Sequence, residues 1–290
     1  MEYSEVERLR FSLAAFAALG TPSKIDGRLR EGGVAGLYAL YERLSAHDRK
    51  EVDAKASVLA AKDIRVTFRG DDAYPDSLLY KQRSSAPILY HWGNSDLLHL
   101  DGVGMCGSRS ASDLGLKAAE ACGLEVSARQ MSVISGYAKG VDTVTHLAAL
   151  NSGGSTVIVL AEGFDHFRIK KNFRDSFDPD KVLVVSQFSP SQPWLAYAAM
   201  ARNKVIFGLG RALVVVEAGE KGGTLAAGEG ALRMGKPVFV LNFGSETPPG
   251  NKILLEKGGY PITSREQLGE ILDKRPSPNR VTQQELPLGN

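Results

Sequence analysis

The stretch RALVVVEAGEKGGTLAAGEGALRMGKPVFV, residues 211–240, contains one complete structural repeat of the chain. An apolar run leads into a glycine-rich loop, a segment of helical length follows over roughly 223–234, and a second apolar run closes the stretch. Runs of about four to six apolar residues, rich in Val and Ile, are typical of parallel strands covered on both faces. The stretch therefore predicts a strand, a crossover helix and a second strand parallel to the first.

The same alternation extends over most of the chain. Further apolar runs are GVGMCGS, SVISG, STVIVLAEG and KVLVVS, and segments of helical length lie at roughly 110–130, 141–151 and 195–208. Strands that alternate with helices in this way build a sheet with helices on both faces. The predicted fold class is α/β, an extended Rossmann-like, doubly wound and mostly parallel sheet of about six strands or more, preceded by a small all-helical domain.

The sequence divides into three segments. Residues 1–63 have helical periodicity, interrupted by a Gly-Gly break, and predict a helical domain of the SAM-like or helix-hairpin-helix-like kind. Residues 64–273 hold the Rossmann-like domain, whose first part, up to Leu100, contains short apolar pieces and prolines and is interpreted as a connecting strand and loop region. Residues 274–290 are rich in Pro and polar residues and predict a flexible tail.

The composition excludes several classes of protein. Of the 290 residues, 43% are hydrophobic, as in a folded chain, and the net charge of +2 is too small for the overall field to attract nucleic acid. Any affinity for nucleic acid would therefore have to come from a local basic patch, and composition alone does not predict DNA binding. The two cysteines lack disulfide or metal spacing, and no stretch resembles a signal peptide or a membrane span, so a cytoplasmic protein with no membrane partner is expected.

Four loops follow predicted strands, and this position predicts that they face one another. They are CGSRS, SGYAKG, EGFDHF and EAGEKGGT. Glycines ahead of a helix expose backbone N–H groups, and Arg109 and Lys139 add positive charge, so the loops predict an anion site. Two alternatives stay open: Ser110 or Ser112 caps a helix while Arg109 pairs with a surface acid, and the glycines of the last loop serve a tight turn.

The glycine spacing excludes the common nucleotide fingerprints. Gly136 and Gly140 enclose Lys139 as Gly-x-x-x-Gly, which matches neither G-x-G-x-x-G nor the Walker A pattern. A G-x-S-x-G nucleophile elbow is also excluded, because Val133 occupies the first glycine position. The five histidines show no ligand spacing, so neither a metal nor a cofactor is expected.

Asp142 and His146, which share one face of a predicted helix, allow two interpretations. They could act as an acid–base pair, or they could support the loop that precedes the helix. Loop support is preferred, because a single pair at this spacing is weak evidence for catalysis.

Two basic segments could extend the anion site. They hold Arg202, Asn203 and Lys204 in one case, and Arg168, Lys170, Lys171 and the neighbouring Phe167 in the other. On the strand-end surface, these side chains would form a groove for a nucleic acid backbone with aromatic rings for base stacking. A solvated charged face and aromatic residues of the core are the alternatives.

Together, these motifs resemble the DNA-processing protein A family, also called DprA or Smf. The resemblance covers about residues 64–265 and rests, in the family's order, on GSRSASDLG, SGYAKGVDTVTHLAAL, GGSTVIVLAEGFD, ARNKVIFGLGRALVVVEA, KGGTLAAGEGALRMGKPVFV and GNKILLEKGGYPI. It implies a non-enzymatic protein that binds single-stranded DNA as a homodimer and helps to load the RecA recombinase during DNA processing, recombination or natural transformation.

The resemblance also implies which residues contact DNA. The phosphate-binding residues are Gly107, Ser108, Arg109, Gly136, Lys139, Gly140, Arg202, Asn203, Lys204, Gly222, Gly223 and Thr224, and Arg168, Lys170, Lys171 and Phe167 are additional candidates. Lys204 replaces the last member of the family's Arg-Asn-Arg, which keeps the charge but loses the planar guanidinium. The C-terminal segment is too short for the winged-helix domain of many members, so a divergent member without that domain is expected.

A second reading comes from phosphoribohydrolases of the same superfamily, which carry the motif P-G-G-x-G-T-x-x-E. Aligned on Gly223 and Thr224, the chain has Lys221 in place of a glycine and Ala227 in place of the catalytic Glu, which argues against hydrolysis. A nucleotide-binding sensor, in a mobile-element or phage-defence setting, stays an alternative, as does an interaction scaffold built on the N-terminal helices. Single-stranded DNA binding is the predicted function.

Overall fold

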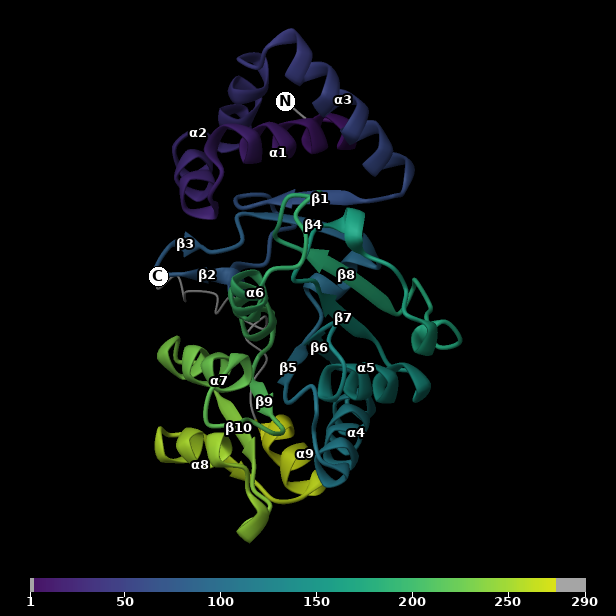
Figure 1. The fold of residues 1–290 in the computed structure, drawn as a ribbon, viewed down its shortest axis with the longest axis vertical. Coiled ribbons are helices and arrows are strands. Elements are labelled where there is room, and N and C mark those ends of the chain that lie inside the picture. Colours follow the sequence, from purple (N-terminus) through teal and green to yellow (C-terminus); the bar gives the residue numbers. More distant parts are fainter. Residues whose placement is uncertain (1–2, 275–290) are drawn as a thin grey trace, which may run out of the picture.

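The computed structural model describes residues 3–274, in which nine strands form one sheet of order β1-β4-β8-β7-β6-β5-β9-β10-β11. These strands are β1 (Arg65–Phe68), β4 (Ile88–Gly93), β5 (Gly102–Cys106), β6 (Ser132–Gly136), β7 (Thr156–Val159), β8 (Val182–Ser186), β9 (Leu213–Val215), β10 (Val238–Leu241) and β11 (Tyr260–Ile262). A separate hairpin joins β2 (Leu79–Tyr80) to β3 (Arg83–Ser84). Figure 1 shows the sheet running down the length of the molecule.

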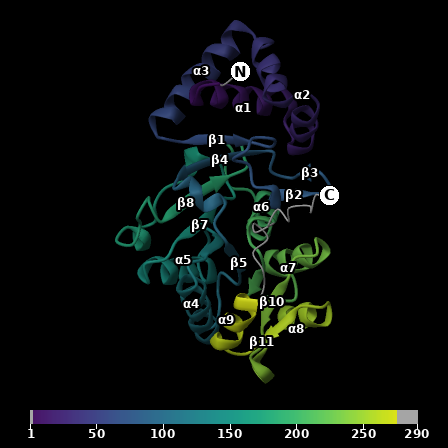
Figure 2. The same ribbon diagram turned by 180° about the vertical axis from the view of Figure 1, so that it is seen from behind.

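Helices cover both faces of the sheet and its upper edge. They are α1 (Glu5–Leu19), α2 (Pro22–Glu42), α3 (Ala46–Ala61), α4 (Asp113–Ala128), α5 (Val141–Asn151), α6 (Ala196–Leu209), α7 (Gly223–Arg233), α8 (Pro249–Glu256) and α9 (Arg265–Lys274). Figures 1 and 2 show α6, α7 and α8 on one face and α4, α5 and α9 on the other. This doubly wound arrangement confirms the predicted α/β fold class.

The strands from β8 to β11 in the sheet order run parallel to one another. Those from β8 to β10 in this order are buried along their whole length, as strands with helices on both faces require, whereas Tyr260 and Pro261 of the edge strand β11 are exposed. The chain proceeds from β5 to β8 in one direction along the sheet, then returns to place β9 on the other side of β5. Ligands of such sheets bind where the order reverses, here at the carboxyl ends of β5 and β9.

The antiparallel edge of the sheet corrects one interpretation of the sequence. Residues 64–100 were expected to be a connecting strand and loop region, but β1 and β4 from this region extend the main sheet. Strand β4 pairs antiparallel with β8, and β1 pairs antiparallel with β4. Such pairing depends on a partner far away in the chain, so the apolar run of β4 alone did not reveal it.

The N-terminal helices cover β1, the edge strand. The N–H of Val66 donates to Glu5 Oε1 at 2.7 Å, and Nη2 of Arg8 donates to the carbonyl oxygen of Val66 at 3.3 Å. The N–H of Phe68 donates to Oδ2 of Asp71 at 2.6 Å, and that carboxylate also pairs with Arg8. Side chains therefore satisfy the N–H groups of Val66 and Phe68 and the carbonyl of Val66, and the N–H of Asp71 donates to the carbonyl of Phe68.

The boundary between residues 63 and 64 lies in a turn, because α3 ends at Ala61 and β1 begins at Arg65. One apolar cluster nevertheless joins Leu9 and Leu59 of the helices to Ile88 and Ile158 of the sheet. The division into domains at 1–63 and 64–273 stays a prediction. Lys274, the first residue of the predicted tail, belongs to α9, and residues 275–290 of that tail lie outside the described residues.

The Gly-Gly break of the sequence coincides with a residue of non-helical conformation inside α2. Gly33 has φ 54° and ψ −154°, which is not helical and lies in a region that favours glycine. The helix is therefore divided at the Gly-Gly break that interrupts the helical periodicity of the sequence. No helix within residues 3–274 is long and apolar enough to cross a membrane.

Candidate functional site

Two adjoining pockets open at the carboxyl ends of the parallel strands. The first pocket has a volume of about 360 Å³, and its walls include Gly107, Arg109, Asp142, Trp194, Met200, Arg202, Asn203, Gly223 and Thr224. The second pocket has a volume of about 340 Å³, and its walls include Arg109, Ser110, Tyr137, Lys139, Glu162, Trp194 and Arg202. The loops after β5, β6, β7 and β9 contribute to these walls, which confirms that the four loops face one another.

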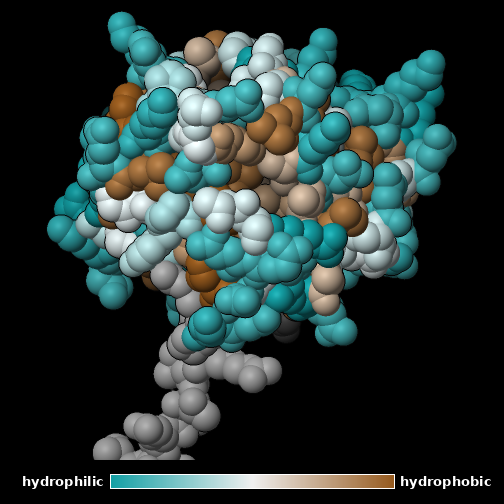
Figure 3. All heavy atoms as spheres, turned by 90° about the horizontal axis from the view of Figure 1, so that it is seen from below, coloured by the Kyte–Doolittle hydropathy of each residue, from teal (hydrophilic) through white to brown (hydrophobic). Residues whose placement is uncertain are grey.

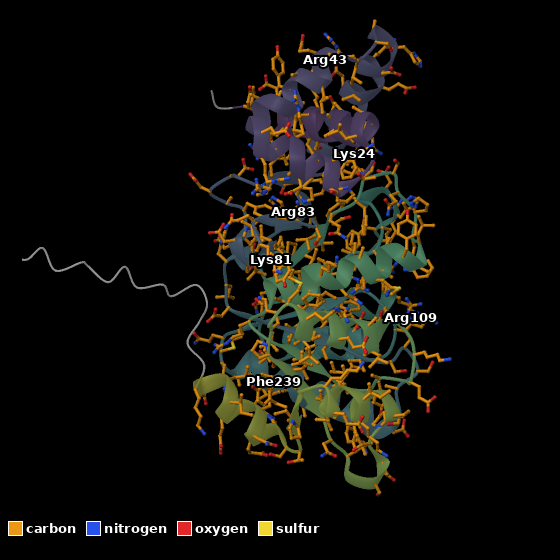
Figure 4. The ribbon with its side chains drawn as sticks, turned by 90° about the vertical axis from the view of Figure 1, so that its left-hand side faces the viewer. Lys24, Arg43, Lys81, Arg83, Arg109 and Phe239 are labelled. Atoms are coloured by element: carbon orange, nitrogen blue, oxygen red, sulfur yellow. The ribbon has the colours of Figure 1, made fainter. Side chains whose placement is uncertain are left out.

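Arg109 stands at the rim between the two pockets. It is exposed and makes no ion pair within residues 3–274, so the alternative in which it pairs with a surface acid is not observed there. Its guanidinium carbon lies 5.4 Å from the centre of the Trp194 ring, a cation–π distance. Figure 4 shows Arg109 near the edge of the molecule, well away from Lys24 and Arg43 of the N-terminal helices.

The serines beside Arg109 organise the start of α4. Ser112 is the N-cap, and its hydroxyl accepts a hydrogen bond from the N–H of Gly115 at 3.0 Å. Ser108 accepts from the N–H of Ser110 at 3.1 Å, which fixes the turn that presents Arg109. Of the alternative in which Ser110 or Ser112 caps a helix while Arg109 pairs with an acid, the structure shows the capping, by Ser112.

Gly140 permits the close approach of the loops after β5 and β6. It has φ 74°, and a Cβ atom at this position would overlap the carbonyl oxygen of Ser108. The N–H of Val141 donates to the same carbonyl at 3.2 Å, so the first turn of α5 is tied to the Ser108 loop. A side chain at Gly136 would likewise overlap the guanidinium of Arg202.

Arg202 forms part of the floor of both pockets and is only 7% exposed. Its Nη1 lies 3.9 Å from Oδ2 of Asp142, and its Nε has no hydrogen-bond partner. Burial lowers the pKa of the guanidinium, and the charge of Asp142 opposes that shift. A buried cation with an unpaired N–H group is suited to an anion that enters from the pocket.

The residues that follow Arg202 have different positions. Asn203 lines the first pocket and donates from Nδ2 to the carbonyl of Gly223 at 3.3 Å. Lys204 is exposed and lies outside the walls of both pockets. The structure therefore brings Asn203, but not Lys204, together with the loop at the start of α7.

The loop before α7 lies against the β5 loop. The hydroxyl of Thr224 donates to the carbonyl of Gly107 at 3.1 Å, which joins the two sides of the sheet reversal. The N-cap of α7 is Gly222, with φ 112° and no side chain to cap the helix. The first backbone N–H groups of α7 therefore lack a side-chain acceptor at the wall of the first pocket.

Lys139 is exposed on the wall of the second pocket, whereas Lys170 lies beside it in a more buried position. The ammonium of Lys170 donates to the carbonyl of Tyr137 and lies 4.0 Å from the centre of that ring. Burial lowers the pKa of Lys170, and the positive charges of Lys139 and Arg109 act in the same direction. Lys170 thus holds the loop that carries Lys139.

The other candidates from residues 167–171 do not line either pocket. Arg168 donates to the carbonyls of Asp165 and Phe167, at 2.9 and 2.6 Å, and Lys171 is exposed. Phe167 packs in an aromatic cluster, with its ring centre 5.7 Å from that of Tyr137. A part in DNA binding stays a prediction for these residues.

Asp142 and His146 both bond to the backbone of the glycine loop. Oδ2 of Asp142 accepts from the N–H of Ala138 at 3.2 Å. Nε2 of His146 lies 2.7 Å from the carbonyl of Gly136, which can only accept, so Nε2 carries the proton. Burial lowers the pKa of His146 to about 4, and its ring is fully buried away from both pockets. These contacts are those of residues that support the loop.

The sequence interpretation missed Trp194 and Glu162. Trp194 lines both pockets although it lies in the loop before α6, and Glu162 lines the second pocket. Burial raises the pKa of Glu162, with the charges of Arg202 and Lys170 opposing. In the sequence, Trp194 follows Pro193 and precedes a helix that bears other large apolar residues, and this pattern could have identified it.

Within residues 3–274, no group of three or more His, Cys, Asp or Glu side chains could hold a metal ion.

Comparisons with known proteins agree on one family. The family model for "DNA recombination-mediator protein A" matches residues 65–273. The DNA processing protein DprA of Streptococcus pneumoniae is 38% identical over 59% of this chain and 60% of its own length. Protein Smf of Escherichia coli is 29% identical over 80% of this chain and 63% of its own length. The chain thus spans about three fifths of the length of these curated relatives.

Solved structures show the same fold. The X-ray structure of DprA from S. pneumoniae aligns with a TM-score of 0.73 and 26% identity, over 95% of this chain and 99% of that one. A structure of DprA from Helicobacter pylori, described as showing a single-stranded DNA binding mode of that protein, aligns with a TM-score of 0.63 and 22% identity, over 73% of this chain and 96% of that one. With the family match over most of its length, the chain belongs to the DNA recombination-mediator protein A family, the DprA/Smf proteins.

Proposed function

We propose that this chain binds single-stranded DNA, without sequence preference, across the two pockets. One observation carries the proposal: donors for an anion gather there without acceptors among the described residues. Arg109 and Lys139 have no acid paired with them, Nε of Arg202 has no partner, and the N-terminus of α7 has no side-chain cap. A phosphate backbone supplies a row of anions that fits such a set.

The family relationship supports the same proposal. The H. pylori relative is described as binding single-stranded DNA, and the S. pneumoniae relative is named a DNA processing protein. Among the residues implied by the resemblance, we assign direct phosphate contacts to Arg109, Lys139, Asn203 and the N–H groups at Gly223 and Thr224. Arg202 would act from beneath the surface, and Gly107, Ser108, Gly136, Gly140 and Gly222 would shape the backbone around it.

The proposal does not include catalysis. The position of the catalytic Glu of the related phosphoribohydrolases is held by Ala227, which is 3% exposed and packs in the core. Asp142 is engaged by the N–H of Ala138 and lies beside Arg202. We therefore assign these groups to support of the binding loops.

Titration of a fluorescent oligonucleotide at several salt concentrations tests the proposal. Binding to a single strand should weaken steeply with salt, and Arg109→Ala should lower the slope of log K against log salt by about 0.7 to 1, the loss of one phosphate contact. Arg233→Ala is the matched control, since it removes an exposed arginine at the other end of α7. Salt-independent binding, or equal slopes for the two variants, would contradict the proposal.

A mononucleotide is the second candidate ligand. Both pockets fall at the lower end of the volume range of small-molecule sites, and the buried guanidinium of Arg202 suits a single phosphate. Competition separates the two ligands. An excess of deoxynucleoside monophosphate should leave the oligonucleotide bound, and a mononucleotide that binds tightly and is not displaced by the oligonucleotide would favour the sensor function.

We further propose a homodimer that forms through the lower end of the sheet. Figure 3 shows this end, where apolar residues gather across the middle of the face and hydrophilic residues surround them. Tyr260 of the edge strand β11 is 51% exposed. Light scattering at micromolar concentration should give the mass of a dimer, and Tyr260→Lys should shift it towards the monomer. A monomeric wild-type chain would exclude the homodimer at that concentration.

The RecA recombinase is proposed as a partner on the strength of the family relationship. A chain that binds single strands and a recombinase that assembles on them share one substrate. The test is RecA assembly on oligonucleotides already coated with a single-strand binding protein. Faster assembly in the presence of this chain, and none of that acceleration with Arg109→Ala, is the expected result.

A further inference from the structure

Three large apolar side chains are exposed along the start of α6. Trp194, Tyr197 and Met200 are 48%, 66% and 55% exposed. Tyr197 and Met200 are three residues apart and lie on one face of the helix, and Trp194 and Met200 line the same pocket. Single exposed apolar residues are common, but a cluster within one turn or two of helix marks a site of interaction.

Trp194 lies between the two sets of anion donors. It lines the first pocket together with Asn203 and Gly223, and the second pocket together with Lys139. A strand that follows the phosphate donors from one pocket to the other must pass this ring. Arg109 lies 5.4 Å from the ring centre and belongs to both pockets, so one cation stands beside the aromatic surface.

The surroundings of Trp194 indicate the chemistry of its occupant. A flat aromatic surface with cations on either side fits a ligand in which planar apolar groups alternate with negative charges. A single-stranded nucleic acid has this pattern, because each base lies between two phosphates. An apolar peptide would leave Arg109 and Lys139 without a counter-charge.

We propose that Trp194 stacks against one base of a bound single strand whose flanking phosphates occupy the two pockets. Tyr197 and Met200 extend the apolar surface to the next base. This inference rests on the single-strand binding proposed above and adds base contacts to the phosphate contacts. Since every base has a flat π-face, the contact strengthens binding without selecting a sequence.

Two oligonucleotides of equal charge test the proposal, one with bases and one made of abasic sugar phosphates. Trp194→Ala should weaken binding of the normal strand by roughly 5- to 150-fold, the range for loss of one stacked base. It should leave the salt slope and the affinity for the abasic strand unchanged, since phosphates are not its target. Trp194→Phe should restore most of the affinity, because it retains a ring. Leu100→Ala is the control, an exposed apolar residue ahead of β5 and at the opposite end of that strand from the pockets.

Fluorescence gives a second readout in a protein with an intact site. The chain has two tryptophans, and Trp92→Phe leaves Trp194 as the only one. Trp92 is stacked on Phe177, with ring centres 5.7 Å apart, and a Phe at this position keeps a ring in that contact. The normal strand should quench Trp194 emission in this variant, and the abasic strand should not.

The outcomes separate this inference from the proposed function. Salt-dependent binding of the normal strand with equal affinity for wild type and Trp194→Ala overturns base stacking and leaves DNA binding intact. If Trp194→Ala lowers the affinity for the normal and the abasic strand equally, base stacking is also overturned, because the ring would then act only through its contact with Arg109. A change of oligomeric state in Trp194→Ala assigns the apolar surface to a second copy of the chain. Failure of the wild-type protein to bind either strand overturns both proposals.

Discussion

Charged side chains gather at two places on the sheet, the antiparallel edge at β1 and the strand ends around the pockets. At the edge, Arg8 pairs with Asp71, and Asp26 pairs with both Arg69 and Arg30 at 3.2 Å. At the strand ends, Arg202 lies 3.9 Å from Asp142, but Arg109 and Lys139 form no ion pair with an acid among residues 3–274. The edge therefore uses charge to complete the fold, whereas the strand ends keep charge available for a ligand.

The largest expected effect is that of Gly140→Ala, which forces apart the loops that form the pockets. The new Cβ would overlap the Ser108 carbonyl at a residue with φ 74°, and strain and overpacking together should cost about 3 kcal/mol or more of stability. Gly235→Ala is the control, because its φ of 72° is similar and nothing lies within 4 Å of the new atom, so about 1 kcal/mol is expected. Urea unfolding measures both variants, and equal losses would show that the loop contact contributes little.

Acidic pH should weaken both regions, because each contains a buried histidine. Burial lowers the pKa of His91 at the edge and of His146 under the glycine loop to about 4, against 6.5 in the unfolded chain. Between these values the unfolded chain binds a proton that the folded one does not. The free energy of unfolding should therefore be unaffected by these residues above pH 6.5, and fall towards pH 4 by up to about 3 kcal/mol for each histidine.

The measurement is urea unfolding from pH 7 to pH 4, on the wild type and on His91→Gln and His146→Gln. Each variant should show a smaller loss between these pH values than the wild type. A wild-type curve that stays level across this interval would contradict the neutral state of both rings.

Asp71→Ala tests the part that charged side chains play at the antiparallel edge of the sheet. It removes the acceptor of the Phe68 N–H and the partner of Arg8, so a loss of about 1–3 kcal/mol of stability is expected. Oligonucleotide affinity should stay at the wild-type value, because Asp71 lines neither of the two pockets. A parallel loss of affinity would show that the N-terminal helices take part in DNA binding.

Arg109→Ala should have the smallest effect on stability. The side chain has no paired acid, so the free energy of unfolding should change by less than about 0.5 kcal/mol while DNA affinity falls. A thermal melt beside the DNA titration measures both quantities on one sample. Marked destabilisation would mean that Arg109 is part of the fold, as Arg8 is.

The parts of the fold that depend on local pattern could be predicted from the sequence. The segment expected at 141–151 is helix α5 with the same bounds, and the glycine loops meet because parallel strands share one carboxyl edge. The extension of the sheet by β1 and β4 could not be predicted, because it depends on the pairing of β4 with β8, which is distant in the chain. Pairing across such distances leaves no periodic signal in the strands themselves.

The residues of the candidate site, too, could be predicted from the sequence only in part. Arg109 and Lys139 could be placed from the strands that precede them. Arg202 was expected among surface charges, and its burial follows from the space that Gly136 leaves, which only tertiary packing reveals. Trp194 was missed because it lies in an irregular loop, and its contact with Arg109 joins residues 85 positions apart.

The side chains that cover β1 bear on how a shortened chain would behave. Without α1, the N–H and carbonyl groups of Val66 would lose Glu5 and Arg8 and face solvent on an edge strand that also bears the apolar side chains of Val66 and Phe68. An uncovered strand of this kind is a template to which strands of other molecules can add. We therefore expect the N-terminal helices to protect the sheet against aggregation, and residues 64–273 expressed alone to precipitate at concentrations at which the whole chain stays in solution.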